Sequence, residues 1–177
     1  EKDWFTYPVL HIDLNAEKYD DPEQLDALLN DTLCLWEDLY GASPSETTLS
    51  LRFKGVIRRA AEQTGRPVVV LIDEYDKPLL QSLHNEALHS AFKNRLKAFY
   101  GVLKSADEFL KFYLLTGVTK FSQVSVFSDL NQLNDISMDR RYNELCGLTW
   151  QEIADNFEPE LQELARYNDL SPEETRE

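Results

Sequence analysis

Two carboxylates stand at the end of the most apolar short run in the chain. The run is Val68 to Ile72, and Asp73 and Glu74 follow it directly. Large aliphatic and β-branched residues in succession are typical of a strand buried on both faces of a parallel sheet. Open α/β sheets bind ligands beyond the carboxyl ends of their strands, so we expect both acids at a ligand-binding edge. There an Asp can hold Mg²⁺, and a Glu can polarise a water that attacks a phosphoryl group.

An aliphatic strand that ends in Asp-Glu is typical of the Walker B motif of many ATPases. It is equally typical of a core strand that ends in a solvated acidic turn. Asp76 adds a carboxylate three residues after Asp73 and could complete a direct metal site. A solvated turn, or a helix N-cap before Pro78, is the favoured interpretation of Asp76. Lys77 would then balance the acidic charge.

A second buried strand, Phe109 to Leu115, ends in Thr116-Gly117, with Thr119 and Lys120 just beyond it. Some ATPases insert a strand between the Walker A and Walker B strands, and that strand carries a polar sensor 1 residue. Its hydroxyl or amide helps to place the attacking water. Thr116 is placed for this role, although a Thr-Gly pair can also simply end a strand in a turn. The order of a strand ending in Asp-Glu, a helix, and a strand ending in Thr-Gly is more specific than either end alone.

The phosphate-binding motif that such chemistry requires is missing from the sequence. No glycine of the chain stands in a G-x-x-x-x-G-K-[ST] frame, in which backbone N–H groups wrap the phosphates. Either a P-loop lies upstream of Glu1 in a longer protein, or the chain is not an NTPase. The start without Met, and a helix-start signal at Ser171-Pro172 near the C-terminus, favour an internal piece of a larger protein.

The elements that would position these residues alternate between strands and helices. Strands are expected at 8–14, 68–73 and 109–115, with a weak strand or a turn at 134–138. Helices are expected from 20 or 21 to 40, after 46 to 64, at 84–104, at 122–127, and from a capping box at Thr149-x-x-Glu152. This alternation predicts an α/β fold with a layered parallel sheet. We place a core at 1–148 and a separate, more polar helical region at 149–177.

Helical periodicity of 3.6 residues selects the side chains that should face the core. The predicted inward positions are Leu25, Leu28, Leu29, Leu33, Trp36 and Leu39, then Leu49, Phe53, Val56, Ile57 and Ala60, then Leu88, Phe92, Leu96, Phe99 and Leu103, and finally Ile153, Phe157, Leu161 and Leu164.

Composition excludes several classes of function. The formal net charge of −14 opposes direct binding to nucleic acid or anionic lipid, and no apolar run reaches membrane-spanning length. Cys34 and Cys146 lie far apart and form neither a metal-ligand spacing nor a disulfide framework, as in a cytoplasmic protein with reduced thiols.

The remaining polar candidates are the histidines and two arginines. His11 is expected in the core, whereas His84 and His89 are expected to be solvated. Arg140 and Arg141 could supply a cation that stabilises the transition state, although most surface arginines are simply solvated and have no catalytic role.

Four segments carry a resemblance to a known family: YPVLHIDL, VVVLIDEYDKPL, FYLLTGVTKFSQVSVFSDLNQLNDIS and RRYNELCGLTWQEI. They resemble the bacterial predicted AAA-ATPase (AAA-ATPase-like) family of P-loop proteins, from about Asp3 to about Leu164. Asp129 departs from the Gly that is common after FS in that family. The resemblance implies a three-layer αβα P-loop NTPase-like fold lacking its first strand, and the start of a helical lid near CGLTWQEI.

Carried over to this chain, the resemblance makes Asp73 the Mg²⁺-coordinating Walker B acid and a cofactor-binding residue. Glu74 becomes the catalytic candidate that activates water, Thr116 the candidate sensor, and Thr119 a second cofactor-binding residue. ATP and Mg²⁺ are the implied ligands of the intact protein. A nuclease-like domain downstream is a further association of the family.

The leading hypothesis is therefore the Walker B and sensor 1 part of an ATP-hydrolysing AAA-like ATPase, inactive or weakly binding as this piece. A non-catalytic regulatory or scaffolding module with an ATPase-like fold is the alternative. A Mg²⁺-dependent phosphoesterase built on Asp73, Glu74 and Asp76 is the third. Without a Walker A strand the sheet would keep an unfilled slot, so we also expect rearrangement or self-association of the piece.

Overall fold

A parallel three-stranded sheet forms the centre of the larger of two compact units. The computed structural model describes residues 5–118, 133–142, 144, 145 and 147–171. The two units are residues 1–132 and 133–177, and each is described by itself. The strands are β1 (Val9–Asp13), β2 (Val68–Asp73) and β3 (Leu110–Leu115), in the order β1-β2-β3. Both pairings are parallel, so the predicted α/β fold with a parallel sheet is confirmed.

Helices connect the strands, and local sequence signals set where they begin and end. They are α1 (Pro22–Tyr40), α2 (Leu49–Thr64), α3 (Lys77–Gln81) and α4 (Glu86–Ser105), with 3₁₀ turns η1 (Leu14–Ala16) and η2 (Asp107–Phe109). Asp21 begins α1 through a capping box with Gln24. Gly65 ends α2 in the left-handed conformation, at φ 63°, which glycine adopts without steric cost. The short helix α3 was not among the expected helices, although a helix N-cap before Pro78 was one interpretation of Asp76.

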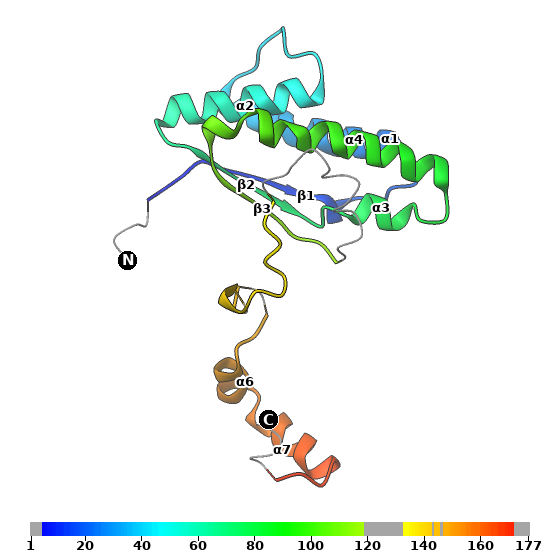
Figure 1. Cartoon of the computed structure of the whole chain (residues 1–177), viewed down its shortest axis with the longest axis vertical. Helices are drawn as coiled ribbons and strands as arrows, with labels where there is room; N and C mark the ends of the chain where they lie inside the picture. Colours follow the sequence, from blue (N-terminus) through cyan, green and yellow to red (C-terminus); the bar gives the residue numbers. More distant parts are fainter. Residues whose placement is uncertain (1–4, 119–132, 143, 146, 172–177) are drawn as a thin grey trace. The chain divides into compact units, whose positions relative to one another are not determined.

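The described helices α1, α2 and α4 lie on one side of the sheet (Figure 1). Beneath them Leu10, Ile12, Val70 and Ile72 are at most 1% exposed. On the opposite face Val9 and Phe112 are about half exposed, and β1 alternates between exposed and buried residues.

The described residues form two layers, since no described helix covers the second face, and the expected third layer stays a prediction. This arrangement corrects two predictions about single side chains. His11 is exposed on that face and is not a core residue, since its odd position on β1 points it away from the helices. Leu39, predicted to face inward on α1, is 71% exposed and is not a core residue.

Three stacked aromatic rings join α1, α2 and α4 above the sheet. Phe53 is fully buried and lies parallel to Phe99, with ring centroids 4.5 Å apart. Trp36 stacks on the other side of Phe53 at 5.9 Å. Aromatic pairs at these separations add to the free energy already gained by burying their area. This stack therefore fixes how the three helices pack over the sheet.

β1 and β3 are the outer strands of the described sheet. β3 pairs with β2 on one side, and among the described residues no strand pairs with its other side. Open strand edges promote pairing with further strands. The unfilled slot predicted beside β3 and the self-association expected from it stay predictions.

The second unit contains a 3₁₀ turn, η3 (Arg140–Tyr142), and two helices, α6 (Trp150–Asn156) and α7 (Glu158–Tyr167). The predicted capping box between Thr149 and Glu152 is present. Residues 134–138 are not a strand and contain a turn. Phe157 and Leu164 are 42% and 51% exposed, so the prediction that they are buried is wrong, because these short helices bury little beyond Ala165. No helix among the described residues is long and apolar enough to span a membrane.

A half-buried ion pair joins α1 to α2 and leads to a pH-dependent prediction. Arg52 donates from Nε and Nη2 to the two carboxylate oxygens of Glu37, at 2.8 and 2.6 Å. Its remaining nitrogen Nη1 donates to Asn30 Oδ1 at 2.6 Å. The hydrogen bond from Arg52 holds the pKa of the Glu37 carboxyl below its ordinary value, against the opposing effect of burial.

A lowered pKa in the folded state gives stability that is fully present above the ordinary pKa of about 4.5 and is lost as the pH falls through the folded value. Glu37→Gln should therefore lower the free energy of unfolding at pH 7 by about 1 kcal/mol or less, since solvent screens part of the pair. Urea unfolding across a pH series should show that this deficit shrinks as the pH falls below about 4.5, through the lowered pKa of the Glu37 carboxyl. Asp38→Asn, on the exposed next position of α1, is the matched control. A deficit that persists unchanged in acid would contradict the prediction.

Candidate active site

The carboxyl ends of β2 and β3 bring Asp73 and Thr116 together. Asp73 is the last residue of β2 and is exposed to solvent. Thr116 follows β3 directly, and its N–H donates to the carbonyl of Ile72 at 2.9 Å, so the strand pairing continues one residue further. The Thr116 hydroxyl donates to Asp73 Oδ1. Two residues that are 43 positions apart in sequence thus share one edge of the sheet.

Glu74 occupies a strained turn beside this pair. Its φ is +54°, in the left-handed region that costs a non-glycine residue about 1–2 kcal/mol. Two backbone bonds hold the turn: Tyr75 N–H donates to Thr116 O, and Lys77 N–H donates to Glu74 O, both at 2.9 Å. The N–H of Glu74 donates to Asp73 Oδ1 at 3.1 Å. The turn therefore places a half-buried carboxylate next to the exposed one.

Asp76 does not join the other two carboxylates. It is fully buried, and its Oδ1 accepts a hydrogen bond from Val118 N–H at 3.3 Å. It stands at the N-cap position of α3, but its side chain makes no capping hydrogen bond there. Asp76 therefore takes the predicted N-cap position before Pro78, but it is buried rather than solvated, and its side chain bonds to the chain beyond β3 instead of capping the helix.

A direct metal site of three carboxylates is also not found. Within the described ranges no group of three His, Cys, Asp or Glu side chains could hold a metal ion. This removes the geometric basis of the phosphoesterase hypothesis. The residues present do fit Mg²⁺ bound together with a phosphate ligand, since that ion keeps several waters and needs only one or two protein carboxylates. Asp73 is exposed and available for this.

Two polar residues at the end of β1 extend the same edge and were missed from the sequence. Asp13 is the register partner of Asp73, and its carboxylate accepts the N–H of Asn15 at 2.8 Å. The Asn15 side-chain oxygen accepts a hydrogen bond from Lys77 Nζ at 2.8 Å. Lys77 was expected only to balance charge, yet it ties the turn after β2 to the segment after β1. The signal that could have found Asp13 was a second strand ending in Asp.

The other candidates have separate outcomes. Thr119 lies outside the described residues. Arg141 forms a bidentate pair with Asp139, which raises the pKa of the guanidinium and lowers that of the carboxyl. Both belong to the second unit, and the role of Arg140 and Arg141 stays a prediction.

His84 is exposed, as predicted, but His89 is not simply solvated. It is half-buried, with Nδ1 3.2 Å from Ser82 Oγ and 3.2 Å from Leu79 O, because it packs where α3 meets α4. Ser82 is 1% exposed, so its hydroxyl is closed to a substrate.

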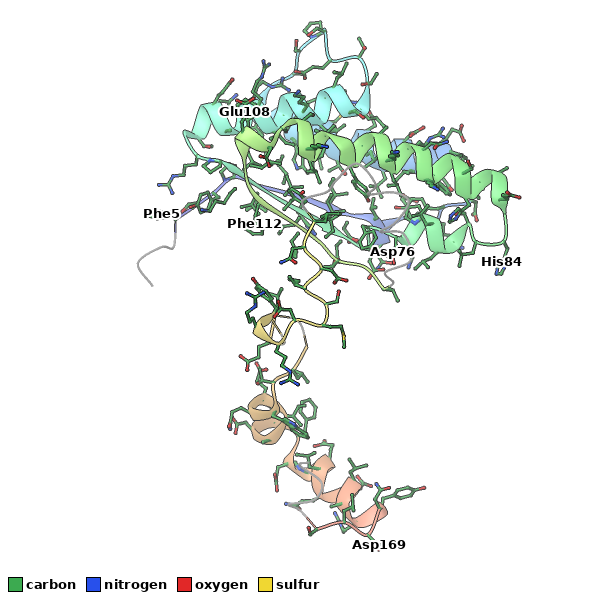
Figure 2. All side chains as sticks on the ribbon, in the orientation of Figure 1. Phe5, Asp76, His84, Glu108, Phe112 and Asp169 are labelled. Carbon is green, nitrogen blue, oxygen red and sulfur yellow. The ribbon has the colours of Figure 1, made fainter. Side chains whose placement is uncertain are left out.

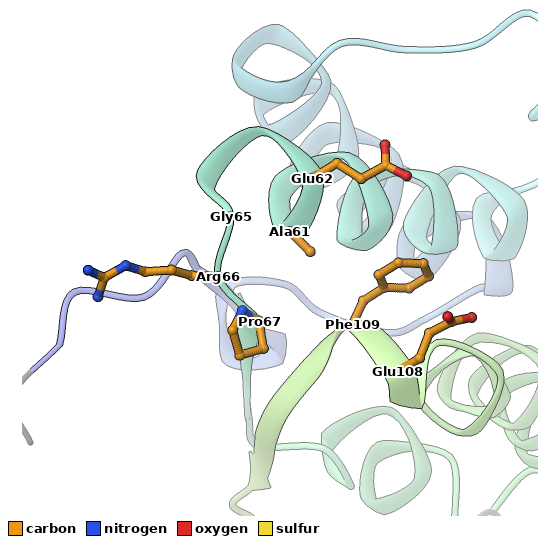
Figure 3. A pocket seen from close by; sticks show the side chains of 7 residues that line it. All are labelled: Ala61, Glu62, Gly65, Arg66, Pro67, Glu108 and Phe109. Carbon is orange, nitrogen blue, oxygen red and sulfur yellow. The ribbon is translucent and has the colours of Figure 1, made fainter.

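A shallow hollow of about 380 Å³ lies at the amino ends of the strands, lined by Ala61, Glu62, Gly65, Arg66, Pro67, Glu108 and Phe109 (Figure 3). Figure 2 shows Glu108 at one end of the larger unit and Asp76 toward the other. Chemistry in open parallel sheets takes place at the carboxyl ends, so the candidate site lies at Asp73 and not in this hollow.

The fold is an α/β fold with a parallel sheet, consistent with a P-loop-like domain. The chain belongs to the family described as Predicted AAA-ATPase, whose match covers residues 1–127. This confirms the resemblance drawn from the sequence. A curated relative, "Uncharacterized protein in vnfD 5'region" of Azotobacter chroococcum mcd 1, is 39% identical over 165 residues. These residues are 93% of this chain and 32% of the relative, so the chain spans about a third of that protein. No solved structure matches.

Proposed function

We propose that this chain carries the Walker B and sensor 1 residues of an ATP-hydrolysing member of its family. The observation that supports this most is the hydrogen bond from the Thr116 hydroxyl to Asp73 at the shared strand edge. A strand-end carboxylate paired with a polar residue of the next strand is the arrangement that ATPases of this kind use. Membership of the predicted AAA-ATPase family agrees with it.

The proposed roles follow from exposure and position. Asp73, exposed and oriented by Thr116, would hold Mg²⁺, usually through water; the ion would neutralise charge that develops on the phosphates. Glu74, adjacent and half-buried, would accept a hydrogen bond from the attacking water and raise its nucleophilicity. Thr116 would orient Asp73 and sense the terminal phosphate. Thr119 is proposed as a further nucleotide contact.

We propose that a phosphate-binding loop is supplied from outside these 177 residues, which contain no G-x-x-x-x-G-K-[ST] motif. Backbone N–H groups of that loop make most of the hydrogen bonds that bind the phosphates. We therefore propose that this chain by itself binds Mg²⁺-ATP weakly and does not turn it over. The test belongs to the full-length gene product.

The full-length protein should hydrolyse ATP in a Mg²⁺-dependent manner. Asp73→Asn should raise the Mg²⁺ concentration for half-maximal turnover at least about tenfold, because a neutral amide holds the ion less well than a carboxylate. A coupled phosphate-release assay across a Mg²⁺ series measures this. Asp38→Asn, exposed on α1 away from the strand ends, is the matched control. Absence of ATP turnover in the wild type, or an unchanged Mg²⁺ dependence in Asp73→Asn, would refute the proposal.

A further inference from the structure

The side chain of Asp76 contacts the segment that follows β3, and Gly117 allows this close approach. A Cβ at Gly117 would lie 2.7 Å from Asp76 Oδ1 and 2.6 Å from the ring of Tyr75. Real Cβ atoms essentially never approach other atoms so closely. Val118, the next residue, donates its N–H to the same Oδ1. The turn after β2 and the segment after β3 are therefore fitted together at Gly117-Val118.

The turn that carries Asp76 is anchored in the core. Tyr75 and Tyr100 are 6% and 1% exposed, and Tyr100 Oη donates to Tyr75 O at 3.3 Å. Burial raises the pKa of Tyr100 well above its ordinary value, and nearby Tyr19 and Asp76 add to this, so the phenol stays a donor. Leu80 N–H donates to Asp76 O at 2.9 Å, which continues the anchor into α3. A shift of Asp76 would therefore disturb buried packing on both sides.

Burying a carboxylate lowers the stability of the fold unless hydrogen bonds compensate for the lost hydration. A turn that only connects a strand to a helix does not require a buried carboxylate. Here Asp76 spans the gap between the two strand ends that carry Asp73 and Thr116. Tyr75 N–H to Thr116 O, on the same turn, is the parallel backbone link.

We propose that Asp76 is a positioning residue that locks the turn after β2 to Gly117-Val118 and so keeps the Thr116 hydroxyl on Asp73. Its structural part stands on the contacts above, and its catalytic consequence rests on the proposed ATP hydrolysis. A displacement of about 1 Å at a reacting site can cost about 100-fold in rate. Loosening this lock should therefore lower turnover without removing any group that contacts ATP.

The structural test uses hydrogen exchange of the Val118 amide in this chain, followed by NMR. Asp76→Ala should raise the exchange rate of Val118 at least about tenfold, and Asp76→Asn, which keeps an acceptor oxygen, should restore most of the protection. Core amides of α1 should change little. Equal rates in wild type and Asp76→Ala, or an equal rise across the whole unit, would overturn the proposal.

Gly117→Ala tests the same contact from the other side and keeps the test decisive if Asp76→Ala does not fold. It should raise the Val118 exchange rate and the unfolding constant, the latter at least about tenfold. Gly101→Ala, in α4, is the matched control, since its Cβ would meet nothing within 4 Å. It should lower the unfolding constant about threefold, as Ala favours helix over Gly. If Gly117→Ala behaves like Gly101→Ala, the lock does not exist.

Turnover of the full-length protein separates the two proposals. Asp76→Ala and Gly117→Ala should lower kcat for ATP at least about tenfold with KM within about threefold, and Asp76→Asn should recover most of kcat. A purely structural role would instead lower the amount of folded protein and leave kcat per folded molecule unchanged, and this outcome overturns the catalytic part. If the wild type hydrolyses no ATP, the proposed function fails, and the Val118 exchange result still decides the lock.

Discussion

Glu74→Gln should lower ATP turnover of the full-length protein by about 100-fold or more while Mg²⁺-ATP binding stays within about threefold. A positioned general base contributes a factor of this order, and glutamine cannot accept the proton or polarise the water as strongly. The amide has nearly the shape of the carboxylate, so the turn and the neighbouring Asp73 should keep their geometry. Rapid-quench turnover and equilibrium binding of a fluorescent ATP analogue measure the two quantities.

The backbone strain at Glu74 supports a functional role for this residue, in addition to the argument from its charge. A left-handed glutamate persists only where the surrounding structure over-determines it, and such residues cluster at functional sites. Five hydrogen bonds among residues 72–77 and Thr116 do so here. Glu62→Gln is the matched control, because Glu62 is exposed on α2, which precedes the amino end of β2. This substitution should leave turnover unchanged. Turnover that is equal in Glu74→Gln and wild type would contradict the role of Glu74, and absence of turnover in both would favour the non-catalytic scaffolding hypothesis.

Patterns within single segments predicted the strands and helices well. The aliphatic run of β2 and the caps at Asp21, Gly65 and Thr149 depend on neighbours a few residues away, and the structure has them where they were predicted. The meeting of Asp73 and Thr116 was also predictable. In a parallel sheet, adjacent strands in sequence usually end at one edge, so a strand-end motif in each is sufficient.

What could not be predicted depends on contacts between distant segments. Asp76 looks like a helix cap in sequence, and only the approach of Gly117, 41 positions later, makes it a buried link. His11 sits in an apolar strand, but which face the helices cover decides its exposure. Ser82 and His89 meet because an unpredicted short helix, α3, turns the chain back toward α4.

Phe53→Ala should destabilise the larger unit by about 3–5 kcal/mol, the range for removing a large buried aromatic side chain. Phe53 is fully buried between Trp36 and Phe99, so its removal leaves a cavity where three helices meet and abolishes two ring contacts. Small domains have only about 5–15 kcal/mol of stability, so the loss is a large share of the total. Urea unfolding followed by far-UV circular dichroism measures it. Phe53→Leu, which keeps most of the volume, should cost much less.

Phe112→Ala is the matched control, because it removes the same ring from the open face of the sheet, where Phe112 is 50% exposed (Figure 2). If helices cover only the other face, Phe112→Ala should cost about 1 kcal/mol or less in this chain, since little apolar area leaves the core. Equal losses at Phe53 and Phe112 would mean that the second face is also covered in solution. Concentration-dependent losses at Phe112 would point to self-association through that face. The difference between the two phenylalanines therefore measures directly how one-sided this sheet is.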